Sequence, residues 1–155
     1  MSRSQPTVFV FWRDAFEEAA AVLFVSELRR LGLRVKVVGL RGPQAAGIHG
    51  LTLLPDLTLG QALPAAGQSC CVVLPCPVKR LQMVKNELRL HTFFQQAAAN
   101  GALFVIGQAE GEGSVGHQNG FVQLAQALNY PPLETLLAFI TALADQLQQC
   151  QSAQK

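Results

Sequence analysis

Charged residues are scarce in this sequence, since only 14% of the 155 residues are Asp, Glu, Lys or Arg. The 12 basic and 10 acidic side chains leave a formal net charge of +2, which is too small to produce the positive field of a nucleic-acid-binding protein. The sequence also lacks an apolar run that is long enough, and free enough of charge, to span a bilayer. We therefore expect neither a nucleic-acid nor a membrane partner.

Cysteine and histidine are also few. Four cysteines, together with a beginning, MSRSQPTVFVFW, that lacks the small-residue cleavage site of a signal peptide, indicate a reducing cytoplasm rather than a disulfide framework. Cys70 and Cys71 begin an apolar segment, where adjacent side chains of a strand fill the core on opposite faces. The histidines His49, His91 and His117 are far apart and show no zinc-type spacing, so no metal site is expected.

Hydrophobic residues, by contrast, make up half of the sequence, so a chain of this length can bury a substantial core. Its length corresponds to one domain, and we expect residues 1–155 to form a single α/β unit. The last residues, 149–155, are polar and are expected to fray.

The first forty residues contain a strand, a helix and a second strand. Residues 7–12, TVFVFW, are β-branched and aromatic, which predicts a buried strand. Asp14 and Glu17 have the spacing of a capping box, and a helical pattern follows that Gly32 ends. Residues 34–40, RVKVVGL, predict the second strand. This βαβ unit implies parallel strands with a right-handed crossover.

The same alternation continues along the chain. Pro55 breaks LTLLPDLTL, and Asp56 is expected to cap a short helix. The segments CCVVLP and ALFVIG predict two further core strands, while helices are expected over 78–99 and 133–147. The pattern predicts a flavodoxin-like α/β sandwich, a mostly parallel sheet with helices on both faces. A receiver-like module is the competing fold, but it needs an acidic cluster where only Asp14 follows the first strand.

Several segments in this order resemble the PfpI/ThiJ family of the class I glutamine amidotransferase-like superfamily. They are VFVFWRDAFEEAAAVLFVSELRRLGLRVKVVGLRG, LTLLPDLTL, CCVVLP, a long helix and GALFVIG, and they cover residues 6–109. The paired Glu17 and Glu18 also match the family's pattern. The resemblance implies the flavodoxin-like fold and a dimeric assembly.

Three positions depart from that family's pattern. The family has a reactive cysteine on the turn after the ALFVI strand, where this chain has Gly107 followed by Gln108. The family has a glycine pair after the VVLP strand, with a backbone N–H that stabilises an oxyanion; here the pair is Cys76 and Pro77, and proline has no N–H. A further supporting glutamate is replaced by Ala20. The resemblance thus implies the fold but argues against the family's chemistry.

These departures predict a catalytically degenerate protein, a pseudoenzyme that acts by binding a partner or a small ligand. Its pocket is expected at the carboxyl ends of the strands, lined by Glu17, Cys76, Gly107, Gln108 and His117. The alternative is an enzyme or redox sensor with a rewired site, in which Cys76 at a helix N-terminus is the thiol and Glu17 supports it. An inert, half-buried thiol is the competing interpretation of Cys76, and Glu17 is equally suited to capping its helix.

The segment GEGSVG, residues 111–116, matches the G-x-G-x-x-G pattern of dinucleotide-binding loops. However, no helix pattern follows it, and Glu110 and Glu112 would repel a pyrophosphate. We therefore expect no cofactor, and His117 is either a pocket residue or an ordinary loop residue.

The first predicted helix is apolar on nearly all sides, because Val22, Phe24 and Val25 lie outside its main apolar stripe. Such a helix must be buried on more than one side. We expect these three residues to form a homodimer interface or, failing that, to bind an unidentified protein partner. Alternatively, the helix over 133–147 of the same chain covers them.

Overall fold

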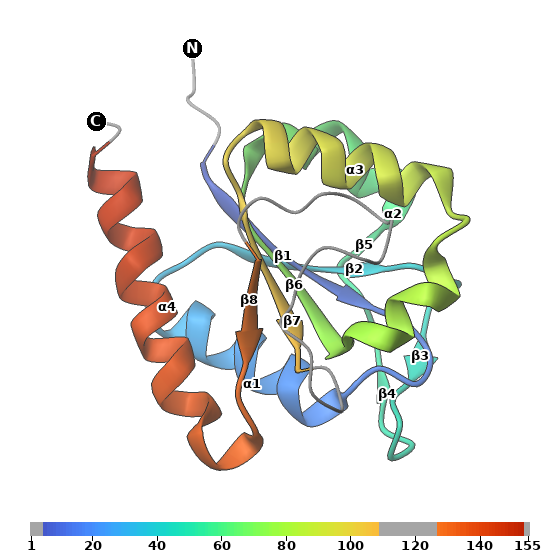
Figure 1. Cartoon of the computed structure of the whole chain (residues 1–155). Coiled ribbons are helices and arrows are strands. Elements are labelled where there is room, and N and C mark those ends of the chain that lie inside the picture. Colours follow the sequence, from blue (N-terminus) through green and yellow to red (C-terminus); the bar gives the residue numbers. More distant parts are fainter. Residues whose placement is uncertain (1–4, 109–126, 154–155) are drawn as a thin grey trace.

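The structure is a computed structural model and describes residues 5–108 and 127–153. Six strands form one sheet, in which all of them are parallel and the order is β5-β2-β1-β6-β7-β8. The strands are labelled in Figure 1. Their bounds are β1 Thr7–Trp12, β2 Val35–Gly39, β5 Leu57–Thr58, β6 Ser69–Pro77, β7 Leu103–Gly107 and β8 Ala127–Tyr130. A separate antiparallel hairpin consists of β3, Ala45–Ala46, and β4, Thr52–Leu53.

Helices cover both faces of the sheet, as a flavodoxin-like α/β fold requires. α1, Glu18–Arg30, and α4, Leu133–Ala153, lie on one face, while α2, Leu59–Ala62, and α3, Leu88–Ala99, lie on the other (Figure 1). Two 3₁₀ helices, η1 Leu63–Gln68 and η2 Val78–Val84, flank β6. The parallel sheet confirms the predicted fold class.

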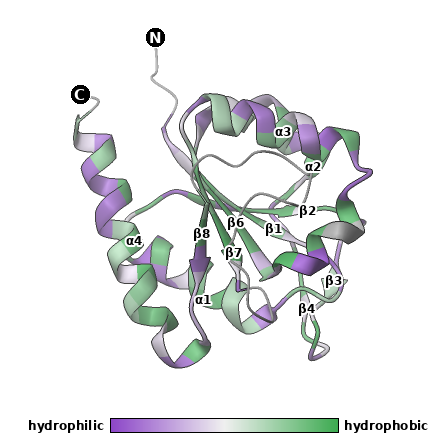
Figure 2. Cartoon of the chain, in the orientation of Figure 1, coloured by the Kyte–Doolittle hydropathy of each residue, from purple (hydrophilic) through white to green (hydrophobic). Residues whose placement is uncertain are grey.

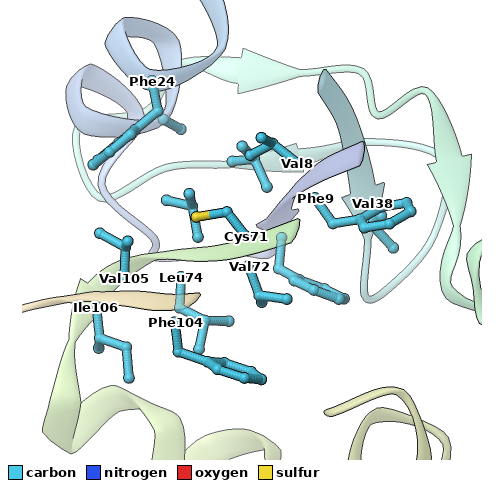
Figure 3. Packing of buried hydrophobic residues seen from close by; sticks show 14 of the residues in the cluster. Val8, Phe9, Phe24, Val38, Cys71, Val72, Leu74, Phe104, Val105 and Ile106 are labelled. Carbon is cyan, nitrogen blue, oxygen red and sulfur yellow. The ribbon is translucent and has the colours of Figure 1, made fainter. Parts of the chain in front are cut away.

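The core lies on both sides of the central strands, where the helices are packed. All six residues of β1 are buried, as are residues 71–76 of β6. Figure 2 shows hydrophobic colours along the central strands of the sheet. On the α3 face, aromatic rings pack edge to face at centroid distances of 5.1–5.7 Å; the rings are those of Phe9, Phe11, Phe93, Phe94 and Phe104. On the opposite face, Phe24 reaches from α1 toward the sheet (Figure 3).

Two predicted helix caps are wrong. The Asp14 carboxylate does not cap α1, which begins at Glu18, because it accepts a hydrogen bond from the Ala46 amide instead. Ala15 adopts a left-handed conformation, φ 67°, and this turn delays the start of the helix. Asp56 likewise accepts from the Val37 amide, while the capping box of α2 is formed by Thr58 with Gln61.

The helix predicted over 78–99 is divided into η2 and α3. A frayed tail was predicted over residues 149–155, but α4 continues to Ala153, and the last two residues lie outside the described part of the chain. The side-chain amide of Gln148 donates to the Leu31 carbonyl oxygen at 2.7 Å, which attaches the last turns of α4 to the end of α1. Among the described residues, no helix has the length and apolarity to cross a membrane.

Candidate functional site at the carboxyl ends of the strands

Three of the predicted site residues lie together where β1, β6 and β7 end. Gly107 at the end of β7 is paired with Pro77 of β6, next to Cys76. The Glu17 amide donates to the Pro75 carbonyl oxygen at 2.7 Å, which fixes the start of α1 against the same strand end. Gln108 follows Gly107 and is exposed, and His117 lies outside the described residues. The structure therefore brings Glu17, Cys76 and Gly107 to one edge of the sheet.

Tyr130 is a site residue that the sequence analysis missed. It ends β8, next to Gly107, and its hydroxyl donates to Oε2 of Glu17 at 2.5 Å. Its side chain is buried, and its ring packs edge to face on Phe24 at 5.5 Å. The available signal was its position directly before two prolines, at the end of the segment ALNY.

Position 107 has no room for a side chain. A Cβ on Gly107 would lie 2.6 Å from the Cys76 carbonyl oxygen and 2.9 Å from the Tyr130 hydroxyl oxygen. Both distances are shorter than van der Waals contact, and the first involves backbone, which cannot rotate away. A nucleophilic side chain at this position would thus require the strand ends to separate.

Cys76 is fully buried at the end of β6. Burial raises the pKa of its thiol far above the ordinary value, and the negative charge of Glu17 raises it further, while Arg80 and Arg13 lower it by less. The segment that follows Cys76 is the 3₁₀ helix η2, and the direction of the pKa shift is opposite to the lowering expected from a helix N-terminus. The thiol is therefore protonated at neutral pH, and protonated thiols are poor nucleophiles.

Tyr130 is also held in its neutral form. Burial raises the pKa of its hydroxyl, and the hydrogen bond to Glu17 raises it further because ionisation would break that bond. The hydroxyl is consequently a permanent donor to the Glu17 carboxylate. The site therefore contains a partly buried hydrogen bond in which the Glu17 carboxylate is already partnered.

The adjacent residues Glu17 and Glu18 point to different parts of the fold, Glu17 to the strand ends and Glu18 to the β3–β4 hairpin. Glu18 is buried and points to the hairpin, where its carboxylate accepts hydrogen bonds from the backbone amides of His49 and Leu51, at 2.9 and 3.1 Å, and contacts His49 Nδ1 at 3.1 Å. Burial alone would raise the pKa of Glu18, but these hydrogen bonds outweigh burial and keep the pKa below its usual value. Glu18 therefore attaches the hairpin to α1 and takes no part in the strand-end cluster.

The residues predicted for a dimer interface are separated by the fold. Val22 is 42% exposed and Val25 is partly buried, but Phe24 is completely buried. Phe24 packs on Tyr130 and on Phe139 of α4, so its prediction as an interface residue is wrong. The physical reason is that α4 covers this side of α1, which the sequence analysis considered only as the alternative.

Among the described residues, His, Cys, Asp and Glu side chains form no group of three that would hold a metal ion. Scans of the sequence against protein-family models and against curated proteins find no match.

Solved structures with the same fold are found. Toxoplasma gondii DJ-1, oxidized, matches with a TM-score of 0.69 over 95% of this chain and 96% of that chain, at 16% identity. Drosophila melanogaster DJ-1beta matches with a TM-score of 0.60 at 22% identity, and a DJ-1 superfamily protein from Salmonella typhimurium with 0.57 at 24% identity. The matches cover 68% and 66% of this chain but only 56% and 55% of those two proteins. The chain therefore has the α/β fold of the DJ-1/ThiJ/PfpI proteins, as its resemblance to the PfpI/ThiJ family implied.

Proposed function

We propose that this chain is a pseudoenzyme of the DJ-1/ThiJ/PfpI fold, which acts by binding a protein partner or a small ligand and not by catalysis. The observation that supports the proposal best is the closed space around Gly107. The resemblance implies that a nucleophilic cysteine belongs at this position, and here the Cys76 carbonyl and the Tyr130 hydroxyl fill the space that its side chain would need.

The oxyanion donor and the supporting carboxylate that the resemblance implies are also altered, and both alterations argue against catalysis. Pro77 has no N–H to stabilise an oxyanion, and the Glu17 carboxylate is bound by the Tyr130 hydroxyl. Nucleophile, oxyanion donor and supporting carboxylate must act together in acyl-transfer or thiol chemistry. Their combined alteration favours a binding role over a weakened catalytic one.

The alternative is a rewired enzyme or redox sensor that uses Cys76. The observation in its favour is that Arg13 and Arg80 lower the pKa of the Cys76 thiol, although burial and Glu17 have the larger, opposite effect. Labelling with iodoacetamide distinguishes the two proposals, because this reagent alkylates exposed thiolates fastest and so reports whether Cys76 is reactive.

Native protein is treated with iodoacetamide at pH 6, and the labelled cysteines are located by mass spectrometry. We expect exposed Cys150 to be labelled first and Cys76 to be labelled as slowly as buried Cys71. A Cys150→Ser variant serves as the control, because it removes the exposed thiol and leaves the buried ones. Fast and selective labelling of Cys76, or turnover in a glyoxalase, deglycase or peptidase assay, would overturn the pseudoenzyme proposal.

We also propose a homodimer, formed through what we call the α1–hairpin face, which consists of Val22, Ile48, Leu51, Leu53 and Leu54. Four of these side chains are exposed apolar groups, with exposed fractions of 42% for Val22, 46% for Ile48, 52% for Leu51 and 74% for Leu54. Val22, Leu53 and Leu54 also line a groove of about 490 Å³. Exposed apolar groups beside an apolar groove are typical of interaction surfaces. The alternative is that an unidentified protein partner binds the α1–hairpin face. The compartment that we propose for the protein is the cytoplasm.

A further inference from the structure

The outer side of β2 is paired with another strand only at its carboxyl end. β5 is two residues long and is in register with Val38 and Gly39 of β2. In the part of the chain that the structure describes, no strand is paired with residues 35–37 on that side. A strand edge that presents unpaired backbone N–H and C=O groups is a template for pairing with another chain. The first half of β2 is such an edge unless other groups occupy it.

The backbone groups of Val35 and Val37 face this outer side. On the side of β1, the Arg34 carbonyl oxygen accepts a hydrogen bond from β1 and the Leu40 amide donates one to it, each at 2.9 Å. In a parallel ladder, the backbone groups of successive residues point alternately to the two neighbouring strands. Because Arg34 and Leu40 face β1, Val35 and Val37 present their amides and carbonyls to the opposite side.

Asp56 and Arg29 bind these outward groups. Asp56 directly precedes β5; its amide donates to the Val37 carbonyl oxygen at 2.9 Å, and its Oδ2 accepts from the Val37 amide at 2.8 Å. Arg29, in the last turn of α1, donates from Nε and Nη2 to the Val35 carbonyl oxygen at 3.3 and 3.0 Å. Nη2 also donates to Asp56 Oδ2 at 2.8 Å, which joins the two side chains along the edge. The two residues thus take the partners that a neighbouring strand would need.

We propose that the Arg29–Asp56 pair closes the edge of β2 against strand pairing with a second copy of this chain. Stability alone does not account for the pair, because exposed ion pairs contribute little and these side chains are 46% and 37% exposed. An incoming strand has to displace both side chains before it can reach the backbone of β2. The proposal goes beyond the proposed function and does not depend on the dimer through the α1–hairpin face.

A second copy of the same edge is the partner that we expect once the pair is removed. Two β2 strands that run antiparallel are related by a two-fold axis, which is the commonest symmetry of homo-oligomers. The edge is reached from the surface, because Arg29, Val37 and Asp56 line the groove of about 490 Å³ beside α1. The net charge of +2 provides little repulsion between two copies.

Asp56→Ala tests the proposal, because it removes both the acceptor of the Val37 amide and the partner of Arg29. Light scattering at rising concentrations is expected to give a mass that reaches at least twice that of the wild type, whichever mass the wild type has. Hydrogen exchange followed by NMR should show a Val37 amide that exchanges fast in the dilute variant and becomes protected as the variant assembles. A wild-type mass at every concentration would overturn the proposal, and so would assembly that leaves this amide unprotected.

Arg29→Ala is the second variant, because it releases the Val35 carbonyl and keeps the backbone contact of Asp56. Its mass should also rise above that of the wild type, by less than the mass of Asp56→Ala. Arg29 is exposed, so this variant is expected to fold, which circular dichroism verifies. If Asp56→Ala does not fold, Arg29→Ala decides the question, and a wild-type mass for it would overturn the proposal.

Arg30→Ala is the matched control, because Arg30 lies in the same turn of α1 and forms an exposed ion pair with Glu27. It removes the same charge as Arg29→Ala and leaves the contacts of Arg29 at the edge of β2 in place. We expect it to keep the wild-type mass at every concentration. Equal assembly of the two arginine variants would show that lost charge is the cause, and the proposal would be overturned.

Discussion

At the scale of single residues, Gly107 of the strand-end cluster has no space for a Cβ. A methyl group there would overlap the Cys76 carbonyl and the Tyr130 hydroxyl, so Gly107→Ala has to push two strand ends apart. Overpacking a well-packed core costs about 1–3 kcal/mol. We expect Gly107→Ala to lower the free energy of unfolding by that amount, measured by urea denaturation.

Gly67 offers a matched control for this substitution, because a Cβ on Gly67 would have no neighbouring atom within 4 Å. Gly67→Ala should leave stability unchanged or raise it slightly, since alanine restricts the unfolded chain. Equal effects of the two substitutions would show that the space around Gly107 is not closed, and the pseudoenzyme proposal would lose its main support.

Part of this cluster was predictable from the sequence, since Glu17, Cys76 and Gly107 follow three strands whose carboxyl ends meet in any parallel sheet. The state of the Cys76 thiol was not, because the direction of its pKa shift depends on burial, which a strand pattern does not quantify. Tyr130 was missed because its strand, β8, has only four residues and lies at the edge of the sheet. The contact that ties up Glu17 therefore required the tertiary structure.

At the scale of secondary structure elements, Glu18 joins two of them, the start of α1 and the β3–β4 hairpin. The pKa of Glu18 is lowered in the folded protein, so its ionised form stabilises the fold. This stabilisation is fully present above the pKa of an unfolded glutamate, about 4.3. It is lost as the pH falls through the lower pKa of the folded state.

We expect Glu18→Gln to be less stable than the wild type at pH 7, because a neutral amide is a weaker acceptor for the His49 and Leu51 amides. Acidification to pH 3 should destabilise the variant less than the wild type. Urea denaturation at both pH values measures the difference. Glu134→Gln, on the exposed side of the first turn of α4, should retain the wild-type pH dependence. If Glu18→Gln also retains the wild-type pH dependence, the Glu18 carboxylate does not stabilise the fold as proposed.

The elements themselves were more predictable than their ends. Apolar segments with helical or strand spacing identified β1, α1, β2, β6 and β7, because burial in a parallel sheet requires such segments. The capping boxes were not predictable: the spacing is present at Asp14 with Glu17 but forms no box at α1, whereas Thr58 with Gln61 forms one at α2. Asp14 has a competing partner in the hairpin amide of Ala46, and the sequence gives no sign of that long-range contact.

At the scale of the whole molecule, one apolar side of α1 is buried within the chain and another stays at the surface. α4 covers the side that carries Phe24, and the side that carries Val22 stays at the surface beside the hairpin. The net charge of +2 provides little repulsion between molecules. The proposed dimer thus depends on the α1–hairpin face, and its most exposed member is Leu54.

Leu54→Glu is expected to dissociate the dimer without unfolding the chain, because Leu54 is 74% exposed and contributes little to the core. Burying one leucine contributes about 1.5–3 kcal/mol, so placing a charge there in both copies should weaken the dimer by at least about tenfold. Light scattering at micromolar concentrations measures the mass, and circular dichroism verifies the fold. Leu88→Glu, at a leucine that is 78% exposed at the start of α3, is the control and should stay dimeric. A wild type that stays at 16.7 kDa as its concentration is raised would refute the homodimer and would leave a different protein as the partner of this face.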